Sequence, residues 1–228
     1  MVKYKEIVSA VLDLLKVTSD DSIFTEEHII YLAGIIRSLL LKQRYYSDLK
    51  KSIPESNYQT ICLDLEKVEK IDGIPCKGYY LRTTKEVPNL IPIGIVKIFP
   101  GDNYYDGEIS FVSSQRFKYT GNNKWLNNII YATIGPNKKI YLKSENPQFL
   151  YLQKIELCGI FENAAEASDL ECKNNDDALC DIMDRDFPIE DSLVSTLIDQ
   201  IIKSLSPSIA APEDITNNAK DDLSGVSK

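Results

Sequence analysis

Apolar residues recur at helical spacing in two segments near the start of the chain. Residues 4–16 predict a short amphipathic helix, because their apolar positions return every three or four residues. A second helix is expected from residue 26 to about residue 45, with Thr25 at its start and two glutamates in its first turn, where negative charge is favourable. The apolar face of this second helix is wide, so we expect it to pack against more than one neighbour.

From residue 57 the pattern changes to short alternating runs that proline and glycine interrupt, which is typical of β-strands. The sequence Gly135-Pro136-Asn137-Lys138 lies between two such runs and predicts a hairpin turn. Residues 113–119 predict one helical turn. The strands themselves are expected near residues 59–65, 79–83, 93–99, 108–112, 128–134, 139–143 and 149–161.

A further amphipathic helix is predicted to open at Pro188 and to continue to about residue 205. The last stretch, residues 206–228, has two prolines and few apolar residues, so we expect it to be disordered in the isolated chain. Together the elements predict an α+β fold. Residues 1–56 are the N-terminal helical part, residues 57–161 an antiparallel β-rich part, and residues 162–205 an acidic connection and the helix that completes a helical bundle. Residues 206–228 form an extended arm.

The formal net charge of −8 is unevenly distributed along the chain. Residues 1–58 are neutral overall, residues 59–161 carry 13 basic and 10 acidic groups, and residues 162–228 carry 5 basic and 16 acidic groups. Phosphate binding needs clustered Lys and Arg, so the acidic last region disfavours tight wrapping of nucleic acid and suits a solvated or partner-docking segment. Charged residues interrupt the apolar runs, so neither a secretory leader nor a membrane span is predicted, and we expect synthesis in a reducing cytoplasm.

Five cysteines are present, with no CxxC pair and no spacing typical of a zinc site. We expect them to be reduced thiols, because cytosolic cysteines are usually small buried apolar residues. One alternative stays open, a metal site made by Cys158, Cys172 and Cys180 and completed by His28.

The sequence contains no recognisable catalytic or cofactor-binding motif. Its ten glycines form neither a GxxxxGK nor a GxGxxG loop, and a catalytic triad would have to use the single histidine, His28. His28 is more simply interpreted as a capping or boundary residue of its helix. We therefore predict a protein that is not an enzyme and that needs no cofactor.

Acidic residues gather before the last helix, in the one place where a calcium site could be argued. The sequence there lacks the central glycine and the final glutamate of a calcium loop, and we expect Asp186 or its neighbours to cap the helix near Pro188 instead. The acidic residues are Asp176, Asp177, Asp181, Asp184, Asp186, Glu190 and Asp191.

The 13 tyrosines would suit interfaces, although ordinary strand composition is the simpler explanation.

Four strings carry a resemblance to a known family: TSDDSIFTEEHIIYL (18–32), LLLKQRYYSDLKKSIPESNYQTICLDL (39–65), NPQFLYLQKIELCGIFE (146–162) and CDIMDRDFPIEDSLV (180–194). They closely resemble a structural ring protein of the crAss-like bacteriophages, over residues 4–223. The order of elements is also similar to that of podovirus adaptors. The resemblance implies a virion protein at the head–tail junction, in a homo-oligomeric and usually dodecameric ring. Its partners would be the portal protein and adjacent tail or ring proteins.

Packaged DNA would pass through the lumen of such a ring without specific binding, and the acidic net charge is compatible with a lining that repels phosphate. We hypothesise that Ile209, Ile215 and Leu223 anchor the C-terminal arm to the portal or to an adjacent subunit. Three alternatives stay open. The chain could form another ring of the tail stack, it could be a ligand-binding phage protein without enzymatic activity, or it could be an enzyme.

Overall fold

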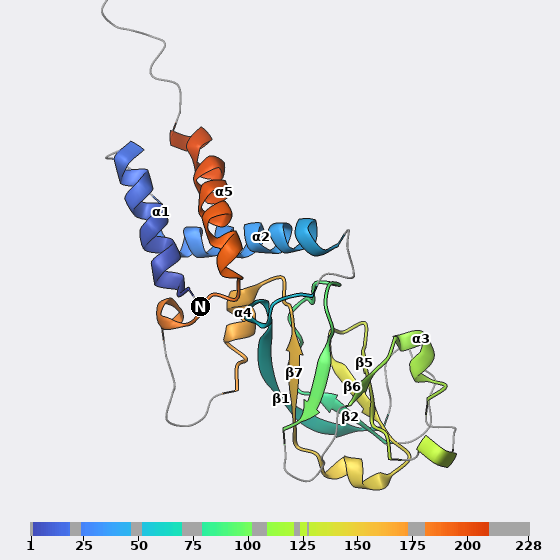
Figure 1. Ribbon diagram of the computed structural model, residues 1–228. Helices are drawn as coiled ribbons and strands as arrows, with labels where there is room; N and C mark the ends of the chain where they lie inside the picture. The colour runs from blue at the N-terminus through green and yellow to red at the C-terminus, as the bar shows by residue number, and fades with distance from the viewer. Residues whose placement is uncertain are drawn as a thin grey trace, which may run out of the picture.

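The computed structural model describes residues 2–18, 24–46, 52–69, 79–101, 109–120, 124–126, 128–172 and 181–209. Helices from the two ends of the chain lie together above a β-sheet made by the middle, which confirms the α+β class (Figure 1). The helices are α1 (Tyr4–Thr18), α2 (Glu26–Tyr45), α3 (Ser114–Phe117), α4 (Ala164–Ser168) and α5 (Asp191–Ile209), with short 3-10 helices η1 (Glu55–Asn57), η2 (Lys124–Leu126), η3 (Pro147–Tyr151) and η4 (Ile182–Asp184). The strands are β1 (Gln59–Val68), β2 (Tyr80–Thr83), β3 (Lys97–Pro100), β4 (Ser110–Phe111), β5 (Tyr131–Ile134), β6 (Ile140–Lys143) and β7 (Lys154–Gly159).

The three long helices share one apolar core. Helices α1 and α5 lie side by side and point the same way, while α2 crosses them (Figure 1). Val11, Leu15, Ile29, Leu41 and Leu197 lie in this core with none of their surface exposed. Helix α2 also contacts α4, because its wide apolar face packs against more than one neighbour. The helices that we expected to form a bundle therefore share a core, and α2 crosses the other two steeply (Figure 1).

The start of the chain is paired with the segment that precedes α5. Lys3 forms an antiparallel bridge with Asp186, and the N–H of Phe187 donates to the carbonyl of Val2 at 2.8 Å. The ring of Phe187 packs edge-on against Tyr4, with 4.9 Å between centroids. Of the residues expected to cap the last helix, Asp186 or its neighbours, Asp186 itself does not do so, because it belongs to this bridge and α5 begins only at Asp191.

The seven strands form one sheet in the order β3-β7-β1-β2-β6-β5-β4. Every pair of neighbours is antiparallel except β4 and β5, which run parallel, so the prediction of an antiparallel sheet is wrong at that edge. The chain between these two strands passes through α3 and η2, and such a crossover lets β5 enter the sheet in the direction of β4. An antiparallel bridge between Ile98 of β3 and Ile109, beside β4, joins the two edges and closes the sheet.

Side chains alternate along β1 and β7 between the interior of the closed sheet and its surface. Ile61, Leu63, Ile155 and Leu157 point inward and are at most 1% exposed, and together with residues of the other strands they form a second apolar core. The period of two that the sequence shows in these segments therefore corresponds to a real division between inside and outside.

The predicted hairpin turn between β5 and β6 is confirmed. The N–H of Gly135 donates to the carbonyl of Lys139 at 2.8 Å, and Lys138 adopts a left-handed backbone conformation with φ 56°. The predicted helical turn at residues 113–119 is also present, as α3.

Strands β3, β5 and β7 each start three or more residues later than the sequence pattern suggested. The apolar residues Ile91 and Ile93 belong to the helical core, and Gly94, at φ 79°, turns the chain before β3 begins at Lys97. Strand β7 begins at Lys154 because the preceding residues form η3, which the side chain of Asn146 caps by accepting from the N–H of Gln148.

Helix α5 continues to Ile209, past the predicted end near residue 205, so the helix includes Pro207. Residues 206–209, which we expected to belong to the arm, are therefore helical, and the remainder of the arm, residues 210–228, lies outside the described residues. Over the part of the chain that the structure describes, no helix has the length and apolar character needed to span a membrane.

Candidate functional site

A buried arginine joins the helical core to the sheet. Arg37 of α2 has none of its surface exposed, and its guanidinium donates to the carbonyl of Phe161 at 2.8 Å and to that of Asn57 at 3.0 Å. Its Nε donates to the carbonyl of Pro188, just before α5. Burial lowers the pKa of Arg37 to about 10, so the side chain stays charged at neutral pH and its charge is solvated by these three carbonyls.

Glu190 occupies the residue before α5 and makes a second buried polar contact. Its carboxylate accepts from the hydroxyl of Tyr45 at 2.6 Å and from the Ser192 hydroxyl at 3.0 Å, and it pairs with Arg44 at 3.0 Å. The N–H of Glu190 donates to the side-chain oxygen of Asn57. Burial, followed by the hydrogen bond to Glu190, raises the pKa of Tyr45 to about 12. Glu190 is thus the acidic residue directly before the start of α5.

The other acidic residues before α5 do not converge on a cation site. Asp181 accepts from the N–H of Met183 at 2.9 Å and caps η4, while Asp184 forms a 2.8 Å ion pair with Lys5 of α1. Among the described residues, the only group of three or more potential metal ligands lies elsewhere, on the sheet. Asp176 and Asp177 lie outside the described residues.

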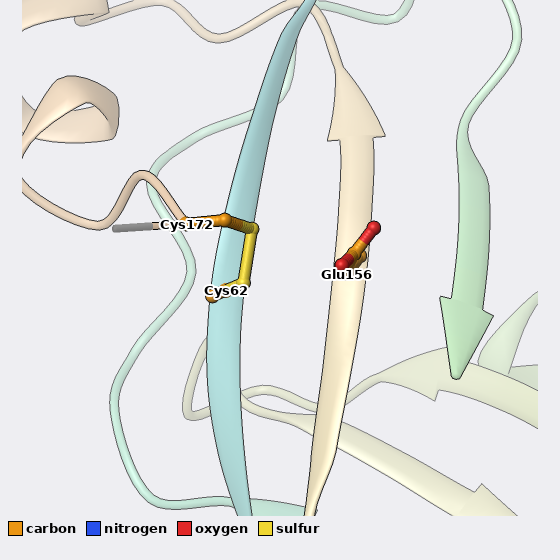
Figure 2. Close-up of side chains that lie close together, drawn as sticks. All are labelled: Cys62, Glu156 and Cys172. Atoms are coloured by element: carbon orange, nitrogen blue, oxygen red, sulfur yellow. A yellow bond between two sulfur atoms is a disulfide. The ribbon is translucent and has the colours of Figure 1, made fainter. Parts of the chain in front are cut away.

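Two cysteines that are 110 residues apart in sequence form a disulfide, so the prediction of reduced thiols is wrong for this pair. Cys62 of β1 is bonded to Cys172, which follows α4, and Glu156 of β7 lies opposite Cys62 in the sheet (Figure 2). All three offer ligand atoms within 4.8 Å of one another. Because metals bind thiolates and not disulfide sulfur, the cluster acts as a covalent link between the sheet and the α4 segment.

The metal site that we left open, from Cys158, Cys172, Cys180 and His28, is not assembled. Cys172 is engaged with Cys62, Cys158 is a free thiol on β7, and Cys180 lies outside the described residues. The N–H of His28 donates to the Thr25 side chain at 3.3 Å, and its ring stacks on Phe24. His28 is therefore a first-turn residue of α2, as the simpler interpretation predicted.

Replacing Cys172 by serine should lower the free energy of unfolding of the oxidised protein by about 2–4 kcal/mol, because the disulfide closes a long loop and restricts the unfolded chain. Denaturant unfolding of the two proteins without reductant measures this difference. The Cys158→Ser variant is the matched control and should change stability little, since Cys158 is unpaired and partly exposed. Equal stability of the wild-type protein with and without dithiothreitol would contradict the link.

The large apolar side chains that are exposed include two groups of residues. On α2, Tyr31, Ile35 and Leu39 are 64%, 49% and 48% exposed and recur every four residues along one face. Trp125 and Tyr119, in and near η2 and α3, are 89% and 68% exposed. Surfaces of this kind are typical of contacts with other protein chains.

Comparison with known proteins shows the family of the chain. Residues 6–223 match the family described as phage tail ring protein 2. The chain is also 49% identical over 221 residues to "Ring protein 2" of Bacteroides phage crAss001, which covers 96% of this chain and 97% of that protein. The chain belongs to the phage tail ring protein 2 family.

Membership in this family confirms the resemblance to crAss-like phage ring proteins. The chain is thus a structural protein of a phage virion that assembles with other virion components. A structural role in a ring favours a protein without enzymatic activity, in agreement with the absence of a catalytic motif from the sequence.

The buried hydrogen bonds of Arg37 and the Cys62–Cys172 disulfide of this ring protein were not predicted from the sequence. Its exposed apolar surfaces were identified only in part. Arg37 lies four residues after Ala33 and four before Leu41, so the helical period places it on the buried face of α2. This spacing could have predicted that Arg37 is buried. No signal paired Cys62 with Cys172. Of the arm residues proposed as anchors, Ile209 ends α5 and its side chain is not described, while Ile215 and Leu223 lie outside the described residues.

Proposed function

We propose that this ring protein adapts the portal to the tail, as a homo-oligomeric ring around the DNA channel at the head–tail junction. Membership in the tail ring protein family over residues 6–223 is the observation that carries the proposal. The order of elements, with helices at both ends and a β-rich middle, supports it because podovirus adaptors have a similar order. The ring would be dodecameric, as those adaptors usually are. Another ring of the tail stack is the alternative within the same family.

The C-terminal arm, in this proposal, attaches the ring to the portal or to an adjacent subunit through Ile209, Ile215 and Leu223. Helix α5 supports this role because its C-terminal end points away from the sheet, so the residues after Ile209 begin at the outer end of the helical part (Figure 1). Isolated apolar residues in a polar segment gain stability when a partner buries them.

DNA would pass through the ring without specific binding. The net charge of −8 supports this, because a lining that is neutral or acidic repels phosphates and leaves the duplex free to slide. The family's structural role also favours contacts with protein partners over contacts with bases.

Mass spectrometry and imaging of purified virions test the proposed function. The chain should be present at the same copy number as the portal protein, and its density should form a ring in direct contact with the portal. A ring that contacts only other tail proteins would favour the alternative position in the stack. Particles that lack the chain would overturn the virion role altogether.

A further inference from the structure

An acidic groove runs along the exposed face of α2. The groove has a volume of about 770 Å³, and its apolar floor is formed by the same α2 face that carries Tyr31, Ile35 and Leu39. The acidic groups at its rim come from both sides: Glu27 from α2 and Glu166 from α4. The other charged lining residues are Glu162 and Lys42, which pair with each other at 2.6 Å. The groove therefore combines an apolar floor with an excess of negative charge.

Gly34, in the middle of α2, lies in this groove, and no neighbouring atom of the described structure requires a glycine at this position. Gly34 lines the groove, and a Cβ atom added to it would meet nothing within 4 Å. Glycine in the interior of a helix is less stable than alanine. Because the space around Gly34 is open, no close packing within the chain compensates for this loss of stability. Glycine does let another chain come close to the helix backbone. The position points to contact with a partner at the centre of the groove.

The second exposed apolar surface has the opposite charge. Tyr119, Trp125 and Leu126 are exposed in this part of the chain, as are Arg116 and Lys118, and the Lys118 ammonium lies 4.6 Å from the centre of the Tyr119 ring. Residues 109–144 of the sequence contain six Lys or Arg residues and no Asp or Glu. We call this surface, Arg116, Lys118, Tyr119, Trp125 and Leu126, the basic aromatic patch. Aromatic residues and arginine are the side chains most enriched in the energetic centres of protein interfaces.

The two surfaces lie on different sides of the molecule. Helix α4, which forms one wall of the groove, and α3, which carries Arg116 of the basic aromatic patch, are separated by the sheet (Figure 1). A cyclic ring is built by a heterologous contact, in which one surface of each subunit binds a different surface of the next. A subunit therefore needs two complementary surfaces on different sides, and these two satisfy that requirement in charge and in apolar character.

We propose that the α2 groove of one copy binds the basic aromatic patch of the next copy, with Trp125 entering the groove over Gly34. This contact rests on the ring assembly proposed above and specifies its subunit interface. Two other occupants fit less well. A second groove would bring acidic rims together, and the arm of residues 210–228 carries four acidic and two basic residues. Both would place like charges opposite Glu27 and Glu166.

Photo-crosslinking of the full-length chain tests the contact directly. A photoreactive phenylalanine analogue in place of Tyr31 should crosslink to residues 109–126 of another copy, which mixed isotope labelling distinguishes from crosslinks within one copy. The same analogue in place of Tyr151, which is 71% exposed, serves as the control for random collisions. Crosslinks from position 31 to a different region, or no excess over the control, would overturn the proposal.

Two single variants provide a second test. Gly34→Gln should block the groove and Trp125→Ala should weaken the patch, so each variant alone should self-associate at least about tenfold more weakly than the wild-type chain. Each keeps one intact surface, so their equimolar mixture should form a heterodimer and nothing larger. Heterodimers without larger oligomers would support the contact. A mixture in which the two variants associate no more than each does alone would contradict it.

Gly34→Ala is the matched control for folding. A Cβ atom at position 34 meets nothing within 4 Å, and both alanine and glutamine favour helix more than glycine does, so melting temperatures of the two Gly34 variants should equal or exceed that of the wild-type protein. The detection of the chain as a ring in virions does not depend on these surfaces. Failure of the crosslink with a ring present would therefore reject only this interface, and absence of the ring would reject the proposed function.

Discussion

Replacing Arg37 by alanine is expected to lower the free energy of unfolding by about 3–5 kcal/mol. Hydrogen bonds that involve a charged group contribute about 1.5–3 kcal/mol each, and the variant leaves the buried carbonyls of Asn57, Phe161 and Pro188 without this donor. Part of the loss is offset, because the variant no longer keeps a guanidinium out of water. Denaturant unfolding followed by circular dichroism measures the difference.

Arg37→Met separates the hydrogen bonds from the packing. Methionine fills a similar volume but donates nothing, so this variant should lose most of the stability that the alanine variant loses. Arg37→Lys keeps a charge but not the planar fork of donors, and it should fall between the wild-type protein and the methionine variant. A methionine variant as stable as the wild-type protein would show that the three hydrogen bonds contribute nothing net.

Deleting residues 210–228 should abolish attachment of the ring while leaving the subunit folded. The cut lies directly after α5, so the buried residues Leu193, Leu197, Ile201 and Leu205, which hold this helix in the core, are all retained. The deletion removes Ile215 and Leu223, two of the three proposed anchors. Copurification of the truncated chain with the portal protein should fall to background, and its melting temperature should stay close to that of the full chain.

A point variant distinguishes the anchors from the length and charge of the arm. Ile215→Asp combined with Leu223→Asp keeps the full length and should reproduce the loss of attachment, because each aspartate would have to be desolvated at the partner surface. Asn217→Asp adds charge at a position with no proposed role and should leave attachment intact. Normal copurification of the truncated chain with the portal would reject the arm as the attachment segment.

The helices and most strands were predictable because each buries one face. Periods of three to four residues placed α1 and α2, and the turn residues around Lys138 placed the β5–β6 hairpin. Local chemistry alone determines such elements. The start of β3 was predicted too early because Ile93 is apolar for a different reason: it belongs to the helical core. Periodicity shows that a residue is buried and does not show which core buries it.

The links between the two parts of the molecule could not be read from local pattern. The partners of Arg37 are carbonyls of three separate segments, and carbonyls carry no sequence signature. The Cys62–Cys172 bond joins residues 110 apart, and cysteine connectivity does not follow from spacing. The wide apolar face of α2 was expected from the sequence, but only the fold shows that the chain itself leaves Tyr31, Ile35 and Leu39 uncovered.

Closure of the sheet through the Ile98–Ile109 bridge has a consequence for a protein that accumulates in many copies. An open sheet presents a row of unpaired N–H and C=O groups at each edge, and these invite strand addition and amyloid-like aggregation. Here β3 and β4 approach one another, so each edge is covered by the other. Copies that meet during assembly of a virion are thereby kept from polymerising through their backbones, and side-chain recognition decides how many join and when growth stops.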